Sequence, residues 1–139
     1  MIKKRILDPE RIRSIKGGFS FIPHRFLTDG FLDILNMKEL LLYFFLILAS
    51  DRYGLSFYSY DAICSLLRLT LDDYIEARDG LIQKDLIACD GTIFQVLELP
   101  ESPIKKSSME AFTASDGPGQ RSRITTLIQQ SLWEAESGR

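Results

Sequence analysis

The stretch Leu-Leu-Leu-Tyr-Phe-Phe-Leu-Ile-Leu, residues 40–48, is an apolar run that no charge interrupts. A segment that is apolar on every side is expected to be buried on every side. Asn36 is a favourable N-cap, and Glu39 stands three residues later, where its side chain can reach back to the backbone N–H of the cap. We therefore predict a central core helix from residue 37 to about residue 50. Its roughly four turns are too short for a bilayer, which takes about 20 apolar residues, so a membrane anchor is the weaker alternative.

A brief strand and a second helix are predicted to follow the central helix. Residues 55–58 alternate in character, which favours a strand. Ser59 is a good N-cap for a helix over residues 60–67. The apolar side chains of this helix that we expect to face inward are Ile63, Leu66 and Leu67.

A third helix and a hairpin are predicted next. Thr70 begins a Thr-x-x-Asp pattern that resembles a capping box, and it predicts a helix from residue 71 to about residue 84. Asp90-Gly91 separates two apolar runs, residues 86–89 and 92–97. Asp-Gly in this setting favours a type I′ turn, which needs positive φ at both central residues. We therefore predict a two-stranded hairpin closed by a two-residue turn.

Composition divides the chain into four parts. Residues 1–18 form a polar, basic N-terminal arm, and residues 19–100 hold the helices and strands described above. Residues 101–122 are rich in Ser, Gly and Pro, which is typical of a flexible linker. Residues 123–139 return to helical spacing and predict a short amphipathic helix. Because a short isolated helix is marginal in water, we expect this one either to dock or to stay frayed.

Charge is distributed unevenly along the chain, although the net charge is only −2. Residues 1–26 carry seven basic and two acidic side chains, whereas residues 27–100 carry five basic and twelve acidic ones. Residues 101–139 are balanced, with five of each. A basic arm on an acidic core indicates two surfaces with different partners.

The sequence offers few groups for catalysis or metal binding. Its two cysteines, Cys64 and Cys89, lie outside any Cys-x-x-Cys pattern and are interpreted as reduced core thiols. The single histidine, His24, has no neighbouring ligand pattern, and Gly17-Gly18 lacks the Lys-Ser/Thr of a phosphate loop. We expect a protein that is not an enzyme and that binds no metal or cofactor. The lack of an apolar run behind the basic start favours the cytoplasm over secretion.

The predicted order of helix, strand, helix, turn, helix and hairpin resembles that of winged helix-turn-helix domains. Ser-Tyr-Asp-Ala-Ile-Cys at residues 59–64 and Leu-Arg-Leu-Thr at residues 67–70 are similar to segments of such domains. Residues 77–87, Ala-Arg-Asp-Gly-Leu-Ile-Gln-Lys-Asp-Leu-Ile, resemble the end of their recognition helix and the first wing strand. Phe-Ile-Pro-His-Arg-Phe-Leu at residues 21–27 resembles the opening of winged-helix domains at the front of phage and plasmid replication initiators. The resemblance covers about residues 19–99, and it implies an α+β fold, mainly α, with a two-stranded wing.

In that family the third helix would lie in the major groove, with the wing against the backbone. The outward residues of this helix would then be Leu71, Asp72, Ile75, Glu76 and Asp79. This face departs from the usual pattern, because carboxylates repel phosphates and pair with little beyond the cytosine amine. Thr70 is the one conventional contact at the helix start, and Asp72 and Asp73 are also explained by the helix dipole. Arg78 is interpreted as a paired or partly buried residue at the edge of the core.

Two hypotheses about function follow. The first is a small DNA-binding accessory protein of a replication, transposition or other mobile-element system, which contacts nucleic acid mainly through phosphates. The candidate DNA contacts are Lys3, Lys4, Arg5, Arg11, Arg13, Lys16, Arg25, Arg68 and Thr70. A positive stripe that joined the arm to Arg25, Arg68, Lys84, Arg121 or Arg123 would favour this hypothesis.

The alternative is a winged-helix module for protein–protein interaction, either dimerisation or assembly with a larger replication or transposition protein, without direct DNA reading. The acidic third helix motivates it, together with an apolar set near the C-terminus that could dock in a groove or swap between subunits. The candidate protein contacts are Ile124, Leu127, Ile128, Leu132 and Trp133. A solvated terminal segment is an alternative interpretation of the basic arm, and acids at this spacing on a helix are usually a solvated face.

Overall fold

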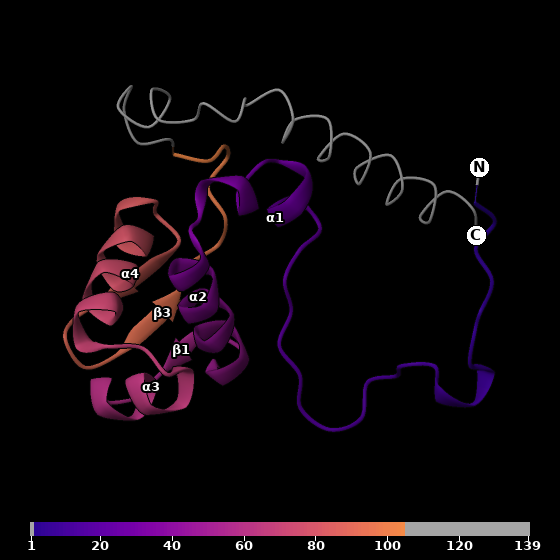
Figure 1. The fold of residues 1–139 in the computed structure, drawn as a ribbon, viewed down its shortest axis with the longest axis horizontal. Coiled ribbons are helices and arrows are strands. Elements are labelled where there is room, and N and C mark those ends of the chain that lie inside the picture. Colours follow the sequence, from indigo (N-terminus) through magenta and orange to yellow (C-terminus); the bar gives the residue numbers. More distant parts are fainter. Residues whose placement is uncertain (1, 105–139) are drawn as a thin grey trace.

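The apolar run forms helix α2 (Met37–Ala49) in the computed structural model, which describes residues 2–104 (Figure 1). The predicted capping box is confirmed. The Asn36 side chain accepts a hydrogen bond from the Glu39 backbone N–H, and the Glu39 carboxylate accepts one from the Asn36 N–H, both at 2.9 Å. The helix ends at Ser50, whose hydroxyl donates to the Ile47 carbonyl at 2.7 Å. The start and end of α2 are therefore set by side chains within three residues of them.

The expectation that α2 is buried on every side is wrong. Four apolar side chains spaced four, three and four residues apart lie on an exposed face, which we call the α2 stripe. They are Met37, Leu41, Phe44 and Leu48, with exposed fractions of 81, 41, 44 and 77%. The opposite face is buried through Leu42, Tyr43, Leu46 and Ile47. The physical reason is that β1, β3 and α4 all pack against one side of α2, so residues 2–104 supply too few layers to cover the other.

The other helices within residues 2–104 are α1 (Arg25–Thr28), α3 (Tyr60–Leu67) and α4 (Leu71–Gln83), with two short 3-10 helices at Pro9–Arg11 and Leu32–Ile34. Both predicted N-caps are confirmed. The Ser59 hydroxyl accepts from the Ala62 N–H at 3.3 Å, and the Thr70 hydroxyl accepts from the Asp73 N–H at 3.1 Å.

The inward face of α3 differs in part from the prediction. Ile63 is buried and Leu67 is half-buried, but Leu66 is 62% exposed. An eight-residue helix that packs along one side buries only a narrow face, and Leu66 falls outside it.

Three short strands form an antiparallel sheet: β1 (Leu55–Ser56), β2 (Ile87–Cys89) and β3 (Phe94–Val96). The strand order is β1-β3-β2, so β3 lies in the middle of the sheet. With its four helices and this sheet, the described part of the chain is a mixed α+β structure, mainly helical. The element order α2, β1, α3, α4, β2, β3 is the order that the sequence predicted.

The hairpin between β2 and β3 forms as predicted, but its turn does not. Cys89 pairs with Phe94, so a four-residue loop replaces the predicted two-residue type I′ turn. Only Gly91 of the Asp-Gly pair has a positive φ, 97°. The Asp90 carboxylate explains the difference, because it accepts hydrogen bonds from the backbone N–H groups of Thr92 and Ile93 at 2.8 and 2.7 Å. These N–H groups hold the pKa of Asp90 below its usual value.

One ion pair lies in the core between α2 and α4. The Lys84 ammonium is 2.7 and 2.8 Å from the two carboxylate oxygens of Glu39, and the side chains are only 6 and 4% exposed. Gly80 makes room for this pair, since a Cβ there would lie 1.8 Å from a Glu39 oxygen. The sequence suggested Lys84 as part of a positive surface stripe, and the structure shows instead that it is buried.

Gly54 allows the chain before β1 to pass close to β3. Its φ is +84°, and a Cβ would lie 2.5 Å from the Val96 carbonyl oxygen. We expect Gly54→Ala to lower the free energy of unfolding by about 3 kcal/mol, from left-handed backbone strain plus this collision. Gly91→Ala is the matched control, because its φ is +97° and its Cβ would meet open space. Urea unfolding of both variants checks the prediction, and equal losses would contradict it.

Candidate nucleic-acid interface

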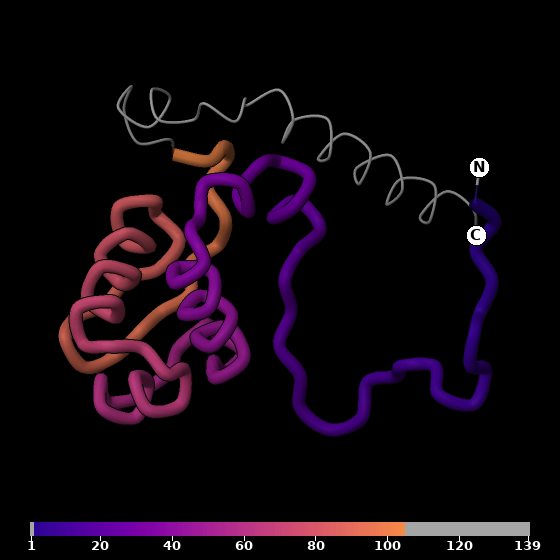
Figure 2. The backbone as a smooth tube through the Cα atoms, viewed as in Figure 1, coloured from indigo at the N-terminus to yellow at the C-terminus, as the bar shows by residue number. Residues whose placement is uncertain are grey.

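The N-terminal arm runs outside the helices and strands before the chain enters α1 (Figure 2). Its one helical element is the 3-10 turn Pro9–Arg11, which Asp8 caps by accepting from the Glu10 N–H at 3.2 Å. Every residue from 2 to 19 is exposed. The exposed set includes all six basic candidates of the arm: Lys3, Lys4, Arg5, Arg11, Arg13 and Lys16. Exposed cations on an open segment can meet phosphates without a fixed geometry.

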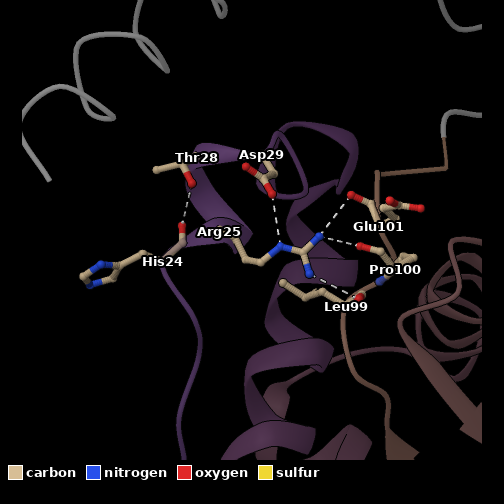
Figure 3. A network of polar contacts seen from close by, with 7 residues as sticks. All are labelled: His24, Arg25, Thr28, Asp29, Leu99, Pro100 and Glu101. Carbon is tan, nitrogen blue, oxygen red and sulfur yellow. Dashed lines mark hydrogen bonds and ion pairs between the residues drawn. The ribbon is translucent and has the colours of Figure 1, made fainter. Parts of the chain in front are cut away.

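Arg25 is engaged within the domain (Figure 3). Its Nε donates to the Asp29 carboxylate at 3.0 Å. Its two terminal nitrogens donate to three backbone carbonyls, those of Leu99 at 3.3 Å, Pro100 at 2.6 Å and Glu101 at 3.1 Å. The guanidinium therefore fastens the chain beyond β3 to α1. It uses most of the donors that a phosphate contact would need.

Arg68 and Thr70 are brought together in the turn between α3 and α4, and both are exposed. Arg68 is the C-cap of α3 in a left-handed conformation, with φ 57° and ψ 45°. The Thr70 hydroxyl caps α4 as an acceptor and keeps its own proton for donation. This turn lies at the opposite end of the domain from α1, so the structure does not bring Arg25 together with Arg68 and Thr70 (Figure 1).

The exposed face of α4 is acidic, through Asp72, Glu76 and Asp79. Ile75, which we expected to face outward with them, is half-buried and packs against the core. Leu71 is exposed, as predicted. The spacing of Asp72, Glu76 and Asp79, four and then three residues, places them on one face of the helix. The contacts of α4 with Glu39 of α2 come from Gly80 and Lys84 at its C-terminal end.

The basic residues beside this face are paired with acidic residues of α4. The Lys38 ammonium of α2 bonds to Asp73, and this hydrogen bond holds the pKa of the carboxyl below its usual value. Arg78 donates to the Asp79 carboxylate at 3.1 and 3.2 Å, and its guanidinium lies 5.7 Å from the centre of the Tyr74 ring. Arg78 is therefore the paired residue at the core edge that the sequence indicated.

The side chains that could bind a metal or act as nucleophiles in residues 2–104 include the His, Cys, Asp and Glu residues. Within this range no three His, Cys, Asp or Glu side chains come together as a metal site. Cys64 and Cys89 are free and half-buried. Burial, followed by the charge of Asp61, raises the pKa of the Cys64 thiol, which disfavours its reactive thiolate.

The α2 stripe is a surface feature that was not predicted from the sequence. The stripe has the spacing of a helix–helix seam, four, three and four residues, but this spacing does not stand out in a run where every residue from 40 to 48 is apolar. The linker beyond residue 104 and the predicted helix over residues 123–139 lie outside the described part. So do the candidate protein contacts Ile124, Leu127, Ile128, Leu132 and Trp133.

None of the helices described between residues 2 and 104 combines the length and apolar character that crossing a membrane requires. Comparisons of the chain with family models, with curated proteins and with solved structures gave no match.

Proposed function

We propose that the chain is a small winged-helix DNA-binding accessory protein of a replication, transposition or other mobile-element system. Support for the winged helix comes from the element order, in which α3 and α4 are joined by a short turn and the β2–β3 hairpin follows as the wing. The third strand, β1, joins the edge of β3, as expected for a wing attached to a small sheet. Since one scaffold serves many roles, the proposed function depends on the surface rather than on the order alone.

The observation that carries the proposal is the contrast between the arm and α4. The arm presents six exposed basic side chains, whereas the exposed face of α4 presents Asp72, Glu76 and Asp79. Phosphates attract the first surface and repel the second. The protein would therefore hold DNA through its arm with weak sequence preference, and α4 would stay out of the major groove.

Replacing the six basic residues of the arm with Gln should weaken binding to a 20-base-pair duplex by about 100-fold or more at low salt. The slope of log K against log salt should also become shallower, by about 0.9 for each phosphate that the variant no longer neutralises. Fluorescence anisotropy between about 50 and 200 mM salt measures both quantities. Arg52→Gln is the control, because Arg52 is an exposed cation of the domain and not of the arm.

Two results would remove this proposal. One is that the wild-type chain binds neither duplex nor single-stranded DNA at low salt. The other is that the arm variant and Arg52→Gln bind equally well.

A second candidate is a protein–protein interaction module without direct DNA contact, and the acidic face of α4 favours it. Three exposed carboxylates on one face of a helix fit a basic protein surface through charge complementarity. The double variant Asp72→Lys, Glu76→Lys should then lose a partner that the full-length wild-type chain retains in pulldowns. If the two chains retain the same proteins, or none, this candidate fails.

A further inference from the structure

The α2 stripe is an apolar surface that residues 2–104 leave exposed. Met37, Leu41, Phe44 and Leu48 lie in one line along the helix, and no charged residue occurs from residue 40 to residue 50. The half-buried Phe45 follows Phe44 on the same helix, and its ring meets that of Tyr58 edge-on, with 5.2 Å between the ring centroids. Soluble chains seldom leave a contiguous apolar surface of this kind without an occupant.

The C-terminal part of the same chain carries a matching segment. Residues 124–133 hold Ile124, Leu127, Ile128 and Leu132 at helical spacing. No charge occurs between Arg123 and Glu134, so the segment is as uncharged as the stretch of α2 that it would cover. A segment of this length is marginal as an isolated helix and gains stability by docking its apolar side.

The path of the chain favours this occupant. Arg25 fastens Leu99 to Glu101 against α1, and Pro103 lies 3.8 Å from the position of a Cβ on Gly30. The chain therefore leaves the described part, at residue 104, beside α1. Helix α1 in turn lies close in sequence to the start of α2. The roughly 20 residues from there to Ile124 have a linker-like composition and a root-mean-square span of about 25 Å. Helix α2 is about 20 Å long, so the segment can reach the whole stripe.

We propose that residues 124–133 dock as an amphipathic helix on the α2 stripe of their own chain. The competing occupant is a second copy of the protein. A short flexible linker gives an effective concentration near the millimolar range. At micromolar protein this exceeds the concentration of a second copy by about a thousandfold, which favours the intramolecular contact. The docking does not depend on DNA binding.

Hydrogen exchange of the full-length chain, followed by mass spectrometry, tests the docking. Leu48→Lys places a charge in the stripe, and Leu66→Lys is the matched control, since both leucines are largely exposed near the end of a helix. We expect the amides of residues 124–133 to be protected in the wild-type chain and in Leu66→Lys. In Leu48→Lys they should exchange at least tenfold faster. Leu127→Lys should abolish the same protection from the other side of the contact.

Three results would overturn the proposal. The first is exchange of these amides at the unstructured rate in the wild-type chain. The second is protection that Leu48→Lys leaves unchanged, which would place the segment elsewhere. The third is protection that rises with protein concentration together with a dimer in sedimentation, which would assign the stripe to a second copy.

Discussion

Lys84→Met should lower the free energy of unfolding by about 3–5 kcal/mol, because it leaves the Glu39 carboxylate buried without its cation. The methionine keeps most of the apolar stem, so reduced packing contributes little. Both side chains of the pair are nearly inaccessible, and water therefore cannot replace the ammonium without opening the α2–α4 contact. Urea unfolding monitored by circular dichroism measures the loss.

Arg78→Met is the control for Lys84→Met. It breaks an ion pair of α4 that lies at the surface, and such pairs contribute at most about 1 kcal/mol. Replacing both Glu39 and Lys84 with Met should recover much of the loss, since apolar side chains of similar volume can substitute for a buried pair. If Lys84→Met costs no more than Arg78→Met, the buried pair does not hold α2 against α4.

Gly80→Ala should lower the free energy of unfolding by about 2–4 kcal/mol, although alanine is the better helix former by about 1 kcal/mol. The new Cβ would lie 1.8 Å from a Glu39 carboxylate oxygen and 2.9 Å from its Cδ. Glu39 cannot move aside freely, because Lys84 and the Asn36 N–H both hold its carboxylate. The change therefore disrupts the pair and the capping box of α2 together.

A double-variant cycle isolates this collision. In a Glu39→Ala background the carboxylate is absent, so Gly80→Ala should become neutral or stabilise by about 1 kcal/mol. A loss of the same size in both backgrounds would show that the cost of Gly80→Ala arises away from Glu39.

The two predictions bear on function because the same packing decides which face of α4 meets the solvent. Gly80 and Lys84 hold the end of α4 against α2. Tyr74, Ala77 and Leu81 are buried, and the exposed carboxylates of Asp72 and Asp79 lie on the opposite side of the helix. The acidic surface of α4 is thus a consequence of how the helix is held. A helix anchored in this way cannot rotate to hide its acids from DNA.

The sequence predicts the local features of this fold well. The caps at Asn36, Ser59 and Thr70 are recovered because each is a hydrogen bond between residues three apart. The Asp-Gly hairpin is placed correctly, but its turn type is not, because the Asp90 side chain supplies acceptors that the backbone pattern ignores.

The features that sequence reasoning missed depend on contacts distant in the chain. Arg25 looked like a free cation, yet the three backbone carbonyls that accept from it lie 74 to 76 residues away. Lys84 looked like a surface residue, yet its partner lies 45 residues away. The apolar run of α2 gives no sign of how many layers cover it, so its exposed stripe emerges only from the packing. The arm, in contrast, has many basic residues that favour exposure, although five of its isoleucine and leucine side chains are exposed as well.

The most direct test of the proposed function maps DNA contacts on the isotopically labelled full-length chain by nuclear magnetic resonance. On titration with a duplex at low salt, amide shifts should concentrate in residues 2–18, while those at the start of α4, from Thr70 to Tyr74, should stay in place. Large shifts at the start of α4 with an unaffected arm would contradict the proposal that the arm, and not this helix, holds DNA.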